Sequence, residues 1–161
     1  MTEAHEVSQS IISAEVAAQL NMRGDIIATE MRRGQLALEG IKEEVKIQAR
    51  AAFVAQNIRR ASELAVHGSG LTILIHQCEL ITRNLKDRNF QKEQDIQNVS
   101  LAVIGSVSFQ SQTNHLVDLL SQDDAAEISA EHLDSLRVVC QKIHAATANI
   151  PIDSDAGLLE H

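Results

Sequence analysis

Apolar residues recur every three or four positions along the first stretch of the chain, from Thr2 to about His67. That spacing is typical of an α-helix with one buried face. The stretch contains no proline, and its first run of turn-forming residues is His67-Gly68-Ser69-Gly70. The pattern therefore predicts one long N-terminal helix that ends at this turn and is about 95 Å long, given the rise per residue of an α-helix.

Two apolar lines run along this helix. The first seam has the seven-residue spacing of a helix packed against another helix, and it consists of Ala17, Leu20, Gly24, Ile27, Met31, Gly34, Leu38, Ile41 and Val45. The second line then takes over and consists of Ile47, Ala51, Val54, Ile58, Ala61 and Ala65. With Phe53 and Leu64 it predicts a wider apolar face, which favours packing against several neighbours.

Gly24 and Gly34 lie on the first seam itself, although a glycine inside a helix costs about 1 kcal/mol relative to alanine. Three interpretations fit this placement. The glycines can mark a kink, they can allow close approach of another helix, or the chain can break near Gly34 or Gly40. A break would divide the stretch into two helices in line.

Three shorter helical segments follow. The segment 71–88 has an apolar stripe made of Leu74, Cys78, Ile81 and Leu85. The next begins near Gln91, and the last runs to Ala148, before Asn149-Ile150-Pro151 ends it, because a residue before proline avoids the helical conformation. Its apolar residues are Leu133, Leu136, Val139, Cys140 and Ile143.

The start of the last helix has two candidate caps. Asp124 with Glu127 resembles a capping box, and Ser129 offers a second start one turn later. At the other end of the chain, Thr2 is a candidate cap for the first helix.

Residues 99–109 are ambiguous, because apolar residues occupy the odd positions and mostly polar residues the even ones, as in a half-buried strand. Paired with 71–77, this segment would form a short hairpin and give an α+β fold. We favour helix, because no turn signal separates Gln91 from Leu120 and two strands alone are marginally stable.

These elements predict an all-α fold, a coiled-coil-like bundle in which one long N-terminal helix packs against three shorter helices. Helix content should exceed about 65%, well above the usual third. Residues 1–150 form a single helical domain, and 151–161 form a polar tail whose last three residues resemble a purification-tag scar.

Composition restricts the core and the partners. The chain of 161 residues lacks tryptophan and tyrosine and has three phenylalanines, so its core is aliphatic. It therefore lacks the aromatic platforms on which single-stranded nucleic acids stack. The net charge of −8 also opposes binding to a phosphate backbone. We expect no nucleic-acid partner.

The chain shows neither a signal peptide nor an apolar run of the length that spans a membrane. We therefore expect a cytoplasmic protein, with export by a route without a signal as the alternative. Cys78 and Cys140 are too few for a disulfide scaffold and should be reduced and buried, since both lie on apolar stripes.

Few residues are candidates for chemistry. Cys140 and His144 are four residues apart on one helix face, a spacing that can supply two zinc ligands. His76 and Cys78, two apart, point in nearly opposite directions on a helix and do not easily share an ion. His76 is also a candidate for phosphotransfer, but the basic and glycine residues expected after such a histidine are missing.

Other site patterns are missing from the sequence. The glycines at 68–70 lack the spacing of a phosphate loop, no Glu-x-x-His step suggests a di-iron site, and no spacing implies a catalytic triad. We therefore predict no catalytic residue, no metal and no cofactor, and we expect a protein that is not an enzyme.

The shape suggests self-association. A long helix with two apolar lines, covered on one side, exposes an apolar surface, and such surfaces usually mark an interface. We expect a homo-oligomer, a dimer or larger, with a structural or regulatory role through protein–protein contacts. The predicted helix-contact and interface residues are Gly24, Ile27, Met31, Gly34 and Leu38.

The alternative function is a secreted, membrane-active or pore-forming helical protein. In that case the apolar segments 71–75 and 99–109 would meet the bilayer. A membrane is a partner only under this interpretation.

Overall fold

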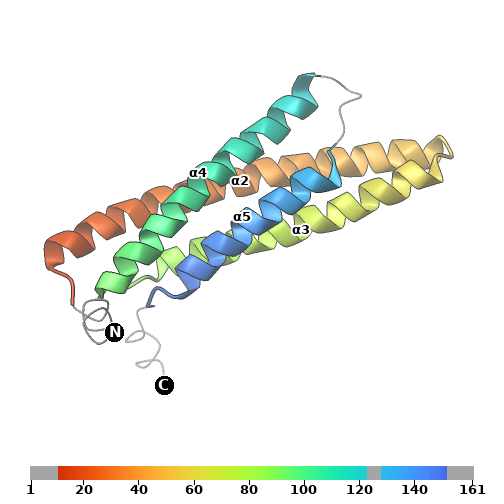
Figure 1. The fold of residues 1–161 in the computed structure, drawn as a ribbon. Helices are drawn as coiled ribbons and strands as arrows, with labels where there is room; N and C mark the ends of the chain where they lie inside the picture. The colour runs from red at the N-terminus through yellow and green to blue at the C-terminus, as the bar shows by residue number, and fades with distance from the viewer. Residues whose placement is uncertain (1–10, 123–127, 152–161) are drawn as a thin grey trace.

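The computed structural model describes residues 11–122 and 128–151, which form four α-helices (Figure 1). They are α2 (Ala14–Val54), α3 (Ile58–Lys86), α4 (Glu93–Gln122) and α5 (Ala130–Ala148). Helix accounts for 87% of the described residues. The prediction of an all-α bundle with one long N-terminal helix and three shorter helices is therefore confirmed.

The helices form two hairpins packed face to face. The α2–α3 hairpin makes the most extensive contact, the α4–α5 hairpin is the second, and the two join where α2 lies beside α4 and α3 beside α5. Segments 71–77 and 99–109 lie inside α3 and α4, so the alternative with a β-hairpin is wrong.

The first helix ends at Val54, which is earlier than predicted. Gln56 has a positive φ of 63°, and the side-chain oxygen of Asn57 accepts the backbone N–H of Arg60 at 3.2 Å. Asparagine is favoured at this position because it satisfies an N–H group that has no partner within the helix. The predicted turn at 67–70 lies inside α3 and is wrong.

Two further predictions about the long stretch concern the continuity of its helix and the face that it buries. α2 passes unbroken through Gly34 and Gly40, so the interpretation of a break there is wrong. The first seam is buried from Leu20 to Val45. The second line is wrong as a buried face, because its large residues are exposed: Ile47, Val54 and Ile58.

Polar side chains cap the N-terminal ends of the last two helices. Ser129 caps α5, its hydroxyl accepting the His132 N–H at 3.3 Å while His132 Nδ1 accepts the Ser129 N–H at 3.3 Å. The Ser129 start is therefore confirmed. In α4, the carboxylate of Asp95 accepts the backbone N–H groups of Gln91 and Lys92 at 2.8 and 3.0 Å. The candidate caps at Thr2 and at 124–127, and the tail from 152, lie outside the described residues.

Candidate functional site: an uncharged apolar face on α4 and α5

Helix α4 contains the longest uncharged run in the chain. No Asp, Glu, Lys or Arg occurs between Asp95 and Asp118, a distance of more than 30 Å along the helix at about 1.5 Å per residue. Elsewhere in the chain charged residues recur more closely. A surface helix typically carries charged or polar residues on its solvent-facing side, and this stretch has no charged residue there.

This helix is buried on only one side. Its inner face is enclosed, as shown by the fully buried Val99, Ala102 and Phe109. Its outer face exposes three large apolar side chains: Leu101 at 54%, Ile104 at 68% and Val107 at 61%. Isolated exposed apolar residues are normal, whereas a contiguous exposed apolar row is a feature that interaction surfaces share.

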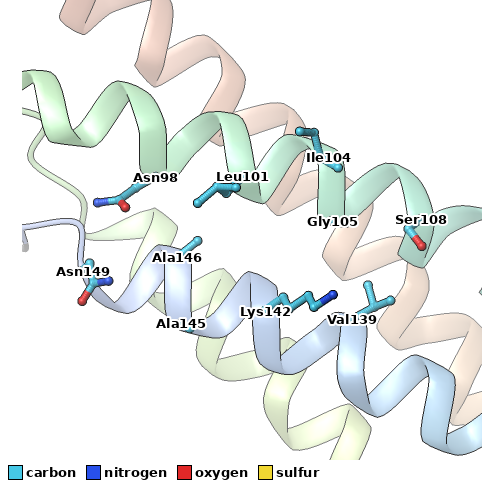
Figure 2. Close-up of a pocket in the computed structure, with 10 residues that line it drawn as sticks. All are labelled: Asn98, Leu101, Ile104, Gly105, Ser108, Val139, Lys142, Ala145, Ala146 and Asn149. Carbon is cyan, nitrogen blue, oxygen red and sulfur yellow. The ribbon is translucent and has the colours of Figure 1, made fainter.

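A groove of about 570 Å³ runs beside this row, between α4 and α5 (Figure 2). Asn98 and Asn149 lie at one end, Ser108 and Val139 at the other, and Lys142 lies along it. Lys142 is the one charged residue among those that line the groove. The groove is therefore largely apolar, with two amide side chains at one end and one ammonium group along its length.

Close helix contact sets the depth of this groove. A Cβ added to Gly105 would lie 2.5 Å from Cγ1 of Ile143, so α4 and α5 approach tightly there. Asn98 is 95% buried, and its Nδ2 has no hydrogen-bond partner within the described residues. An unsatisfied buried amide is destabilising, at about 1–3 kcal/mol.

The five residues predicted at a helix contact lie inside this chain. Ile27, Met31 and Leu38 are fully buried. A Cβ on Gly34 would meet the ring of Phe109, with Cε1 at 2.0 Å, so the interpretation of close approach by another helix is confirmed for this glycine. Their assignment to an interface between copies stays a prediction, but in this conformation a second copy must pack on other side chains.

The absence of a side chain at Gly24 leaves room for Arg88, which joins the α3–α4 turn to α2. A Cβ there would lie 2.9 Å from Nε of Arg88. Arg88 donates to the side chain of Asn21 at 2.8 Å, pairs with Asp25 at 2.7 Å and lies over the ring of Phe90 at 5.8 Å. These contacts hold the α3–α4 turn against α2.

A second polar cluster bridges α2 and α3. Gln35 is 98% buried, and its Nε2 donates to Glu39 and to Glu79, each at 3.2 Å. Since an amide N–H₂ carries two donors, one side chain satisfies both carboxylates.

The two cysteines lie together in the core. Both are free and fully buried, as predicted. A hydrogen bond to Cys140, followed by burial, raises the pKa of the Cys78 thiol far above its usual range. Both effects favour the neutral thiol, which is the unreactive form.

The fold does not bring together the remaining residues that were candidates for chemistry. His76 is exposed and lies 3.9 Å from a carboxylate oxygen of Glu79, and His144 is partly buried on α5. Within residues 11–122 and 128–151, no three His, Cys, Asp or Glu side chains gather closely enough to hold a metal ion. In the same residues, no helix has the length and apolar character needed to cross a membrane.

Sequence reasoning did not identify the row of Leu101, Ile104 and Val107 as a surface. Two signals were present, namely the uncharged run and the apolar odd positions of 99–109. The pattern is compatible with a core helix, with a strand and, under the alternative function, with a segment that meets a bilayer, because sequence alone does not tell how many sides of a helix are covered. Comparisons with models of protein families, with curated proteins and with solved structures returned no match.

Proposed function

We propose that this is a non-enzymatic helical protein that acts through protein–protein contacts, and that it self-associates through the uncharged face of α4 and the adjoining groove of α5. The single observation that carries the proposal is the row of exposed Leu101, Ile104 and Val107 on the part of α4 between Asp95 and Asp118, which has no charged residue. Depletion of charged residues is the compositional signal of the centre of an interface.

A second copy is the partner that this charge distribution favours. Each chain carries −8, so most of its surface repels another copy. Between Asp95 and Asp118 this repulsion is locally absent, and an uncharged apolar face is complementary to itself. A two-fold axis can then place the apolar row of each copy in the groove of the other, as symmetric dimers require.

The available area suits such a contact. The outer face from Ile96 to Val117 is about 30 Å long, and with the neighbouring surface of α5 it is about 20 Å wide, since packed helices lie about 10 Å apart. This corresponds to about 600 Å² per copy, close to the roughly 800 Å² per partner of a standard interface.

Sedimentation velocity over a concentration series tests this proposal. At tens of micromolar we expect a species of twice the chain mass of 17.6 kDa. Ile104→Glu should shift it to the monomer, because two buried carboxylates would face each other across the two-fold axis. Ile104 is mostly exposed in the single chain, so this change should leave folding intact.

The matched control is Ile73→Glu, on the exposed side of α3, which should sediment as the unaltered protein does. Met31→Lys is not a suitable test of the interface. Met31 is fully buried within the chain, so this variant should unfold whether or not the protein self-associates. A wild-type monomer at tens of micromolar, or an Ile104→Glu dimer, would refute the proposal.

A further inference from the structure

The end of the α2–α3 hairpin, residues 46–67, is a second exposed surface, and we call it the apex. It lies at the far end of the molecule, where α2 turns into α3 (Figure 1). Three large apolar residues surround the turn with most of their surface in solvent: Phe53 at 66%, Val54 at 81% and Ile58 at 57%. Because Leu133 near the start of α5 lies opposite Gly70, α5 covers α3 only beyond the apex.

The apex is basic in an acidic protein. Four basic side chains and one acidic one occur in 46–67, so it carries +3 while the whole chain carries −8. The basic residues are Lys46, Arg50, Arg59 and Arg60. Two surface ion pairs at 3.4 Å, Lys46–Glu43 and Arg59–Glu63, offset part of this charge, but such exposed pairs are weak.

Two of the basic residues lie where a helix disfavours positive charge. Arg59 and Arg60 lie in the first turn of α3, which contains no acidic residue. The N-terminal end of a helix carries partial positive charge, so cations there are unfavourable. Residues that oppose a local preference at an exposed position are expected where function requires them.

A groove of about 390 Å³ adjoins the apex on one side of the hairpin. Lys42, Lys46 and Arg50, which are spaced four apart along α2, line it together with the hydroxyl-bearing Ser69 and Thr72 of α3, and no acidic residue does. The hydroxyl groups of Ser69 and Thr72 already donate to the backbone carbonyls of Ala65 and Gly68. The ammonium and guanidinium groups are therefore the ligands that this groove offers to a phosphate group.

We infer that the apex docks on an anionic lipid surface. Phe53, Val54 and Ile58 enter the boundary between headgroups and acyl chains, while the basic side chains contact lipid phosphates. This combination of apolar and basic residues is typical of reversible binding at the membrane interface. The inference is independent of self-association, since the apex and the α4 face share no residue.

A bilayer fits the apex better than an acidic protein does. The exposed apolar side chains stand at a narrow, protruding end rather than around a hollow, and a protein partner would have to supply the matching cavity. A bilayer admits protruding side chains without one, and its anionic headgroups complement the +3 of the apex.

Vesicle binding tests the inference with the full chain. We expect co-sedimentation with vesicles of phosphatidylcholine and phosphatidylserine, little with phosphatidylcholine alone, and weakening by salt. The double variant Phe53→Ser/Val54→Ser and the double variant Arg50→Gln/Arg59→Gln should each reduce the partition coefficient at least about tenfold. All four positions are exposed, so folding is not at risk.

A fluorescent reporter adds a direct measure of insertion. The chain has no tryptophan, so Phe53→Trp introduces a single probe whose emission should shift to shorter wavelength on anionic vesicles. Ile73→Trp, which is also exposed on α3 but lies outside the apex, should not shift.

Three results would overturn the inference. They are an absence of binding to anionic vesicles, binding that both apex double variants retain, and binding of poly-glutamate that depends on the arginines but not on Phe53. The last would identify an acidic protein as the partner. Ile104→Glu should bind vesicles, so a failure of self-association does not imitate a failure here.

Discussion

Replacing Gly34 by alanine should destabilise the protein, although alanine is the better helix former. The new Cβ would lie 2.0 Å from Cε1 and 2.6 Å from Cζ of Phe109. An ordinary contact distance requires a movement of more than about 1 Å, and Phe109 is fully buried on α4 and has no free space to enter. Either the ring leaves its position or α2 and α4 move apart.

The magnitude follows from two opposing effects. Overpacking of a core costs about 1–3 kcal/mol, and the depth of this overlap favours the upper end. Alanine offsets about 1 kcal/mol of this through its helix propensity. We therefore expect Gly34→Ala to lower the free energy of unfolding by about 2 kcal/mol, or the melting temperature by roughly 4–8 °C for a chain of this length.

Gly40→Ala is the matched control on the same helix. A Cβ at Gly40 meets nothing within 4 Å, so only the propensity term applies and stability should rise by about 1 kcal/mol. Guanidinium unfolding followed by circular dichroism measures both variants. An Ile104→Glu background prevents self-association from contributing to the result.

A double-mutant cycle attributes the loss to the contact with Phe109. In the presence of Phe109→Leu, Gly34→Ala should cost at least about 1 kcal/mol less, because the ring that it displaces is missing. If Gly34→Ala proves as stable as the unaltered protein while Gly40→Ala gains stability, α2 and α4 do not pack as closely as described, and the reasoning is refuted.

Three further outcomes are expected. Gln56→Gly should stabilise the chain by about 0.5–1 kcal/mol in thermal unfolding, because glycine adopts the positive φ at the α2–α3 turn without strain; a loss would contradict that backbone conformation. Gln35→Glu places a third carboxylate beside the two that Gln35 bridges, so it should cost about 2–3 kcal/mol at pH 7 in guanidinium unfolding; unchanged stability would contradict this bridge. Cys78 and Cys140 should resist a bulky maleimide in the native protein, even at mildly alkaline pH, because burial and the raised pKa of Cys78 keep its thiol neutral; rapid native labelling of both would count against this core.

Local pattern was sufficient for the parts of the fold that depend on the helical period. The buried residues of the first seam, from Leu20 to Val45, repeat at steps of three and four, and any helix with that repeat buries them together. The cap at Ser129 was equally readable, because the hydroxyl acts on its own helix. These features involve residues within a turn of each other, and sequence records such neighbours directly.

The residue at which the first helix ends could not be predicted from local pattern. Glycine and proline are the strongest turn formers, and the chain has neither at Gln56 and Asn57, where it turns. It has two glycines at 68–70, where it remains helical. Gly70 lies in α3 opposite Leu133 of α5, at an ordinary contact distance, so this part of the chain packs against α5 as a continuous helix.

Which apolar residues remain in solvent was decided by tertiary structure alone. The rows on α4 and at the apex have the same residue types as the core, and their period gives no sign of their exposure. Leu101, Ile104 and Val107 remain exposed because α2 and α5 cover the other sides of α4. Phe53, Val54 and Ile58 remain exposed because α5 is short and covers α3 only from about Gly70 onward, away from the apex. Sequence determines which face of a helix is apolar, but the lengths and contacts of the neighbouring helices determine whether that face is covered.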